Sequence, residues 1–163
     1  MSWVAATCLL LVAACGGSSA QPASTPSGGG QSVNTCAKAK ASRHLAYLVV
    51  QHLSGAAIQR CVGFESDTIG GASVMRGSGI QYQTQEASSG PVVCQIDHEP
   101  SQLGNCLSSD QPQWSLWLET AGQWTVASTD YSQLVLHNRE GLGWRYVLPT
   151  ATSPAPPPLP RQT

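Results

Sequence analysis

Hydrophobic and polar residues alternate along residues 112–128, and this pattern predicts a β-hairpin. Trp114 and the two leucines after it alternate with other residues, residues 120–122 form a short Gly-containing turn, and Trp124 opens a second alternating run. A period of two with a turn in the middle is typical of two paired strands. Because successive side chains of a strand point to opposite faces, Trp114 and Trp117 lie on different faces. We expect one of them in the core, and the other either against a second covering segment or in the wall of a ligand site.

The other hydrophobic runs predict more strands and one short helix. Residues 45–52 and 56–64 are rich in β-forming side chains and are joined across a Gly-containing turn, which predicts a second hairpin. Ser66 or Asp67 then supplies an N-cap, and apolar residues at helical spacing up to Gly77 predict a short helix. Further strands are expected at residues 80–85, 92–97, 134–136 and 144–148. Two strands, a helix and several more strands predict a single α+β domain.

The first 14 residues predict a lipoprotein signal peptide. An apolar run covers residues 3–14, which is too short to span about 30 Å of hydrocarbon and is typical of a secretory signal. Small and aliphatic residues precede Cys15 and glycines follow it, an arrangement that resembles the bacterial lipobox. No Lys or Arg stands before the apolar run, although a signal peptide normally begins with positive charge. We expect Cys15 to be diacylglycerated and to anchor the protein to the extracytoplasmic face of a bacterial membrane. The alternative is an ordinary cleaved signal with an incidental cysteine.

The segments on either side of the domain differ from it in composition. Residues 15–33 are rich in Gly, Ser and Pro and poor in apolar side chains, so we expect a flexible linker that separates the domain from the membrane. Residues 149–163 contain PAPPPLP, and we expect a disordered tail of polyproline type. Residues 34–148 remain as one domain of ordinary size.

Charge and cysteine content narrow the classes of function. Charged residues are 10% of the chain and the formal net charge is -1, so no basic surface for nucleic acid is expected. Four cysteines follow the lipobox in an oxidising compartment and allow three pairings. We favour Cys94 with Cys106, which closes a short loop, and Cys36 with Cys61. No CxxC occurs and the histidines lack metal-ligand spacing, so no metal site is expected.

Four separated stretches resemble the C-terminal domain of transcobalamin and intrinsic factor, and resemble more closely the bacterial transcobalamin-like domains of secreted and membrane-anchored proteins. They are DTIGGASVMRGSGI, VVCQID, QWSLWL with the GQW after it, and EGLGWRY, and the resemblance covers residues 45–146. Gly70 and Ala72 stand where that pattern usually has a threonine and a leucine. The resemblance implies a β-grasp-like fold, in which a mixed or antiparallel sheet wraps one short helix.

Catalytic motifs are few. Asp97-His98-Glu99 places two carboxylates beside a histidine, which can serve acid–base chemistry, but neighbouring side chains of an extended segment point apart. Neither a nucleophile elbow nor a phosphate-binding loop occurs. We therefore expect no enzyme activity and no cofactor.

The aromatic side chains favour ligand binding instead. The candidate ligand-binding residues are Trp114, Trp117, Trp124, Tyr131 and Trp144, since aromatic walls with scattered polar groups are the usual composition of a small-molecule site. In the two-domain vertebrate relatives the corrinoid lies between this domain and a helical partner domain, so the resemblance implies that this chain offers half of such a site. We expect a lipoprotein that binds a corrinoid-like small molecule and delivers it to a transporter. The alternative is a surface adhesion or protein-interaction module that uses the same fold as a scaffold.

Overall fold

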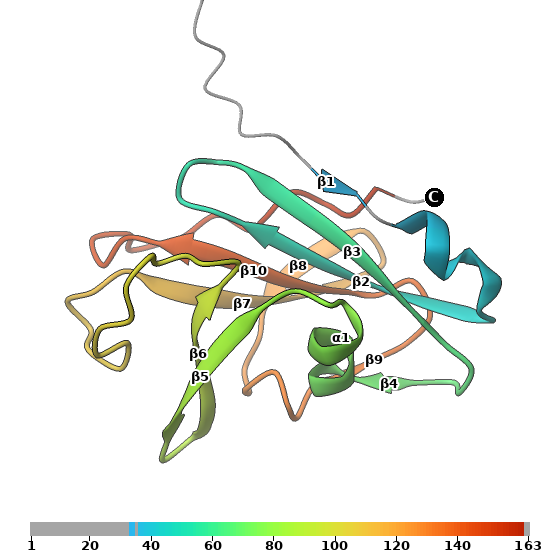
Figure 1. The fold of residues 1–163 in the computed structure, drawn as a ribbon, viewed down its shortest axis with the longest axis horizontal. Coiled ribbons are helices and arrows are strands. Elements are labelled where there is room, and N and C mark those ends of the chain that lie inside the picture. The colour runs from blue at the N-terminus through green and yellow to red at the C-terminus, as the bar shows by residue number, and fades with distance from the viewer. Residues whose placement is uncertain (1–32, 35, 162–163) are drawn as a thin grey trace, which may run out of the picture.

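A six-stranded mixed sheet forms the centre of the domain in the computed structural model, which describes residues 33–34 and 36–161 (Figure 1). The strands lie in the order β1 (Val33–Asn34), β3 (Ala57–Phe64), β2 (His44–Gln51), β10 (Gly141–Val147), β7 (Gln113–Thr120) and β8 (Gln123–Val126). β1 is parallel to β3 and β10 is parallel to β2, while the other neighbours are antiparallel. The predicted signal peptide, Cys15 and the linker up to residue 32 lie outside the described residues.

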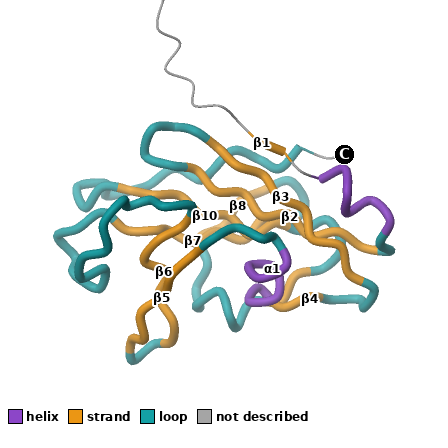
Figure 2. Tube along the Cα trace, viewed as in Figure 1, coloured by secondary structure: helices purple, strands orange, loops and turns teal. Residues whose placement is uncertain are grey.

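Smaller elements surround this sheet. They are the 3-10 helix η1 (Cys36–Ala41), the α-helix α1 (Gly71–Gly77), the pair β4 (Ile69–Gly70) and β9 (Val135–Leu136), and the hairpin of β5 (Tyr82–Ala87) and β6 (Gly90–Ile96). The chain between β6 and β7 is a long loop (Figure 2). A mainly β domain with one short α-helix among the described residues confirms the predicted α+β class.

Both predicted hairpins of the main sheet are present. β2 and β3 pair along all eight of their residues. β7 and β8 join through Ala121 and Gly122, whose φ angles of 53° and 80° are both positive. A two-residue turn with positive φ at both positions matches the right-handed twist of the flanking strands. The tryptophan hairpin therefore has the turn that its sequence predicts.

Both faces of the main sheet are covered. Alternate strand residues build a first face that packs into the hydrophobic core, among them Leu48, Val50, Ile58, Trp114, Leu142, Trp144 and Tyr146. The residues between them build a second face, which includes Tyr47, Val49, Gln59, Trp117, Glu119 and Gly143. Tyr47 and Glu119 are each 1% exposed. The second face is therefore largely buried along β2, β10 and the end of β7, and is open at Val126 of β8, which is 63% exposed.

The α-helix begins later than the sequence predicts. The predicted caps Ser66 and Asp67 precede β4, which pairs with β9 and does not start the helix. α1 begins at Gly71, and its N-cap residue Gly70 makes no side-chain hydrogen bond. The Gly71 N–H donates to Leu134 O at 2.8 Å. The residue before β9 thus supplies the acceptor that a capping side chain would otherwise provide.

The proline-rich tail is not the disordered segment that we predicted. Residues 149–161 lie over the second face of the sheet, and Pro157 and Pro160 are buried. In Figure 1 this segment returns across the molecule and ends near β1. Composition predicted disorder because prolines form no ladder hydrogen bonds. The prediction was wrong because Trp124 and the bare backbone at Gly143 give the proline rings an apolar surface on which to pack.

Two disulfides attach loops and turns to the strands. Cys36 and Cys61 join η1 to β3, and Cys94 and Cys106 join β6 to the loop before β7, with Cα separations of 4.7 and 5.4 Å. This is the pairing that the sequence analysis favoured. Because disulfides persist in oxidising compartments, they indicate an extracytoplasmic location.

Candidate functional site

A groove of about 440 Å³ opens on the first face, between the β5–β6 hairpin, β7 and residues 127–133. Its lining combines the aromatic residues Trp114, Tyr131 and Trp144 and the apolar Leu116 and Val92 with the polar Ser89, Ser128, Thr129, Asp130 and Gln133. Small-molecule sites usually measure about 300–1,000 Å³ and have this mixture of side chains. The groove can therefore hold a small ligand or one part of a larger one.

Three aromatic side chains from separate segments form the base of the groove. Trp144 Nε1 donates to Met75 Sδ at 3.3 Å, and the Trp144 ring meets the Tyr131 ring edge-on with centroids 6.1 Å apart. Trp114 Nε1 donates to the backbone oxygen of Glu99 at 3.2 Å. Trp114, Tyr131 and Trp144 are 9%, 7% and 4% exposed. The rings are therefore fixed by packing, and only a small part of each reaches the groove.

Asp130 is the acidic residue of the groove. Its Oδ1 accepts hydrogen bonds from the Ser132 backbone N–H at 2.8 Å and from the Ser132 hydroxyl, and the hydroxyl contact lowers the pKa of Asp130 below its ordinary value. Its Oδ2 is buried and has no hydrogen-bond partner among residues 33–34 and 36–161. A Cβ on Gly90, which has a φ of 112°, would lie 2.9 Å from this oxygen. Glycine thus lets the hairpin tip close over the Asp130 carboxylate.

Tyr131 stays protonated at neutral pH. Burial raises the pKa of its hydroxyl, and the proximity of Tyr82 adds to the rise. Burial also raises the pKa of Tyr146, with a contribution from the charge of Glu99. Tyr146 packs against Trp114 with ring centroids 4.9 Å apart. The base of the groove therefore carries no charge of its own.

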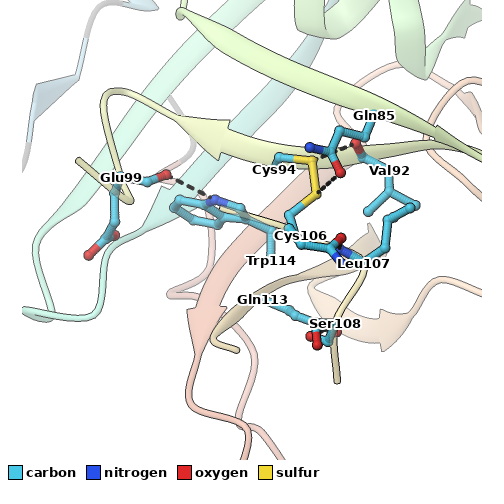
Figure 3. The surroundings of a disulfide bond; sticks show 10 residues. Gln85, Val92, Cys94, Glu99, Cys106, Leu107, Ser108, Gln113 and Trp114 are labelled. Atoms are coloured by element: carbon cyan, nitrogen blue, oxygen red, sulfur yellow. Dashed lines mark hydrogen bonds between the residues drawn. A yellow bond between two sulfur atoms is a disulfide. The ribbon is translucent and has the colours of Figure 1, made fainter. Parts of the chain in front are cut away.

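A second hollow of about 310 Å³ lies beside the groove and shares Val93 and Trp114 with it. Figure 3 shows the disulfide between Cys94 and Cys106 at this place, with Trp114 nearby. Gln113 Nε2 donates to the oxygen of Ser108 at 2.9 Å, so this loop is held both by the disulfide and by the start of β7. The long loop thus forms a fixed outer wall.

Trp117 and Trp124 do not reach the groove. Trp117 stands opposite Gly143 in the sheet register, and Trp124 stands opposite Glu119, which places both indoles on the second face. Trp117 is 6% exposed. Of the five predicted ligand-binding residues, three come together at the groove and two lie on the second face. Trp114 is the member of the pair that packs into the hydrophobic core, and Trp117 is buried on the second face. The pair is therefore explained by two packing surfaces, and the ligand wall stays a prediction.

The two carboxylates of the Asp97-His98-Glu99 motif face His52, which directly follows β2. His52 Nδ1 lies 2.7 Å from Glu99 Oε2, and its Nε2 lies 3.5 Å from Asp97 Oδ2. His98, between them in sequence, has a φ of 64°. Both ring nitrogens of His52 thus lie next to carboxylates of this motif. The arrangement favours a structural contact, and the absence of enzyme activity stays a prediction.

The structure also bears on metal binding and on membrane-spanning helices. Within residues 33–34 and 36–161, no group of three or more His, Cys, Asp or Glu side chains is placed to hold a metal ion. In the same part of the chain, no helix has the length and apolar character needed to cross a membrane.

Comparison with protein families and with curated proteins gives no match. A similar solved structure is that of a "putative metal binding protein" from Ruminococcus gnavus ATCC 29149, with 12% sequence identity and a TM-score of 0.47. The match covers 65% of this chain and 98% of that chain. A likeness at this level assigns neither fold nor function. What the structure itself defines is a disulfide-bonded α+β domain with an aromatic groove on one face of its sheet.

Sequence reasoning missed the polar rim of the groove. Within residues 127–133 only Tyr131 is among the predicted ligand-binding residues, yet the segment also supplies Asp130 and its neighbours to the groove. The Asp130-Tyr131-Ser132 order is a signal for a side-chain turn, because an aspartate readily accepts from the residue two positions on. The sequence cannot show that this turn faces Gly90, which is 40 positions earlier in the numbering.

Proposed function

We propose that this chain is an extracytoplasmic, membrane-anchored module that binds a small, largely apolar molecule in the groove of the first face. The observation that carries the proposal is the convergence of Trp114, Tyr131 and Trp144 on one open groove, with Asp130 at its rim. Fixed aromatic rings with a few polar groups are what small-molecule sites are made of. A ligand that fits has a flat apolar part against the aromatic base and polar groups that meet the serine, threonine and glutamine side chains of the lining.

A corrinoid is the ligand that the resemblance to transcobalamin-like domains suggests. A groove of about 440 Å³ holds one edge of so large a molecule and leaves the rest exposed. The proposal therefore includes a second protein, such as a transporter component, that covers the exposed part. Weak binding by the isolated domain and tight binding in the complex follow from this arrangement.

The sheet order supports a β-grasp-like fold as part of the proposal. The hairpin of β2 and β3 is followed by α1, and β10 then lies parallel to β2 with β7 on its other side. Val74 and Met75 of α1 are fully buried in the core that the first face builds. A helix enclosed by the first face of a mixed sheet is the arrangement that the resemblance implies.

Isothermal titration calorimetry of the folded chain with cobalamin, and separately with protoporphyrin as an unrelated planar ligand, tests the groove. Ser89 and Ser88 are exposed neighbours in the hairpin turn, but only Ser89 lines the groove. We expect saturable binding of cobalamin that Ser89→Phe weakens by about tenfold or more, equivalent to 1.4 kcal/mol, and that Ser88→Phe leaves unchanged. Binding of protoporphyrin alone would reject the corrinoid. If neither cobalamin nor protoporphyrin gives a saturable heat of binding, the groove would be rejected as the binding site.

The membrane anchor has a separate test, because Cys15 lies outside the described residues. Fractionation of cells that express the wild type and the Cys15→Ala variant should find the wild type in membranes and the variant in the soluble extracytoplasmic fraction. Cys8→Ala is the matched control and should leave the wild-type distribution unchanged. Membrane association that survives Cys15→Ala would reject lipidation as the anchor.

A further inference from the structure

The proline-rich tail is buried at every third residue. Pro154 is half-buried and Pro157 and Pro160 are buried, while the residues between them are exposed. Leu159 remains 52% exposed although it is apolar. A polyproline II helix has three residues per turn, so prolines at this spacing lie along one side of it. The tail therefore presents a ridge of prolines to the second face of the sheet.

On the second face, the ridge packs against Trp124 and against the backbone of Gly143, which has no side chain. A Cβ on Gly143 would lie 2.6 Å from Trp124 Cζ3 and 2.8 Å from Pro157 Cγ. The missing side chain thus lets an indole and a proline ring approach β10 together. Trp117 stands opposite Gly143 in the register and lies on the same face. Aromatic surfaces of this kind recognise proline-rich segments, because the polyproline helix is preformed and loses little entropy on binding.

Side chains of the sheet hold the backbone of the tail at both ends of the ridge. Arg145 Nη1 donates to the oxygens of Ala155 and Pro156 at 3.0 and 3.2 Å. Gln59 Nε2 donates to Arg161 O at 3.0 Å, and the Arg161 N–H donates to Gln59 Oε1 at 2.8 Å. Proline has no N–H, so a proline-rich segment offers mainly carbonyl oxygens. The second face supplies the donors that such a segment needs.

The face has donors that the tail leaves unused. The indole N–H groups of Trp117 and Trp124 are buried and have no acceptor among residues 33–34 and 36–161. Strand pairing of β10 ends at Val147, before the tail begins. The tail can therefore leave the sheet without breaking its ladder, as weakly attached segments do in local opening.

From these observations we propose that the second face recognises a proline-rich segment of a partner protein in the polyproline II conformation, with prolines three residues apart. The tail of this chain is the competitor that occupies the face in the absence of the partner. The Ala151 N–H donates to Leu148 O at 3.0 Å in a tight turn that returns the tail to its own sheet. A second copy of the chain therefore offers nothing that the tethered tail lacks, whereas a partner whose carbonyls reach Trp117 and Trp124 gains two hydrogen bonds.

The site is independent of the small-molecule groove, which lies on the opposite face. The tail competes at an effective concentration in the millimolar range, as short tethers do. An intact chain is therefore expected to bind a separate peptide much more weakly than a chain without its tail. If no ligand binds in the groove, the expectation for the peptide on the second face is unchanged. If the peptide does not bind, the proposal for the groove is likewise unchanged.

The proposal is tested with a labelled peptide that has the sequence of residues 154–163 and a chain that is truncated after Ser153. Fluorescence anisotropy of the peptide measures its binding to this truncated chain. We expect saturable binding to the truncated chain and binding at least about tenfold weaker to the intact chain. A peptide that keeps only Pro154, Pro157 and Pro160 and changes all other residues should still bind. The peptide with Pro157→Ala and Pro160→Ala should not.

Variants of the chain connect the binding to the second face. In the truncated chain, Arg145→Met removes two donors to the peptide and should weaken binding about tenfold. Arg76→Met, on α1, removes a contact to Ser73 and should have no effect.

If the truncated chain does not fold, a protease site inserted between Thr152 and Ser153 allows the tail to be cut after folding, and the labelled peptide should then replace it. Absence of binding or exchange in a folded protein, or equal binding of the alanine peptide, would overturn the proposal. An intact chain that is dimeric by light scattering and monomeric after truncation would overturn the assignment to a partner protein.

Discussion

A methyl group at Gly71 tests how closely α1 approaches the segment that forms the groove. The Cβ of an alanine at this position would lie 2.2 Å from the backbone oxygen of Tyr131 and 3.4 Å from Leu134 Cβ. Normal contact for such atoms is about 3.5 Å, and a backbone oxygen cannot rotate away as a flexible side chain can. Gly71→Ala therefore requires the helix start and residue 131 to move apart by about 1 Å.

The size of the effect follows from three contributions. Overpacking of this kind costs about 1–3 kcal/mol. Moving the helix start also weakens the hydrogen bond from Gly71 N–H to Leu134 O, which contributes about 1 kcal/mol. Alanine gains back up to about 1 kcal/mol because glycine loses more chain entropy on folding. We expect a net loss of about 1–3 kcal/mol, which lowers the Tm of a domain of this size by about 5–10 °C.

Gly70→Ala is the matched control, because the two glycines are adjacent. Gly70 has an ordinary φ of -73°, and its added Cβ would meet nothing within 4 Å. We expect Gly70→Ala to change stability by about 0.5 kcal/mol or less, in the stabilising direction. Urea unfolding followed by circular dichroism measures both variants. Equal stability of the two variants would refute the close packing of α1 on residue 131, and with it the fixed position of the groove base.

Three further predictions concern other parts of the molecule. The folded pKa values of Tyr131 and Tyr146 are raised above 10.0. Their contribution to stability is therefore complete below pH 10 and falls as the pH rises through the folded values. The urea midpoint of unfolding should drop less across this pH range for Tyr131→Phe than for the wild type. Replacing Cys36 and Cys61 by serine removes a bridge of sequence separation 25 and should cost about 3.5 kcal/mol by the chain-entropy relation, measured in the same unfolding assay against the oxidised wild type. Gly122→Ala places a side chain at a φ of 80° and should cost about 1 kcal/mol, without any change in ligand binding by calorimetry.

The strands of the main sheet could be predicted because the alternation of side chains that specifies each strand lies within the strand itself. Alternation in residues 112–128 predicts both the tryptophan hairpin and the separation of Trp114 from Trp117, and the structure has both. The helix start could not be predicted in the same way. Its acceptor is the backbone of Leu134, more than 60 residues away, and no pattern near Gly71 records that contact.

The candidate site could be predicted only in part for the same reason. Aromatic composition identified Trp114, Tyr131 and Trp144, but it identified Trp117 and Trp124 with equal weight. What separates the two groups is the face of the sheet on which each side chain lies. That assignment needs the order of the strands and the path of the tail, and both are long-range properties.

The two faces of the sheet explain why a small domain can keep an open aromatic groove without losing its core. On the second face, the proline-rich tail, which has no strand or helix, packs with Trp124 over Gly143, where the missing side chain gives both of them room. On the first face, α1 covers the part of the core near Met75, while residues 127–133 and the β5–β6 hairpin stand apart around Trp114 and Tyr131. Trp144 contacts both regions, because its N–H is fixed by Met75 and its ring lines the groove. A ligand in the groove therefore rests on a side chain that the helix already holds in place, so binding requires little reorganisation of the core.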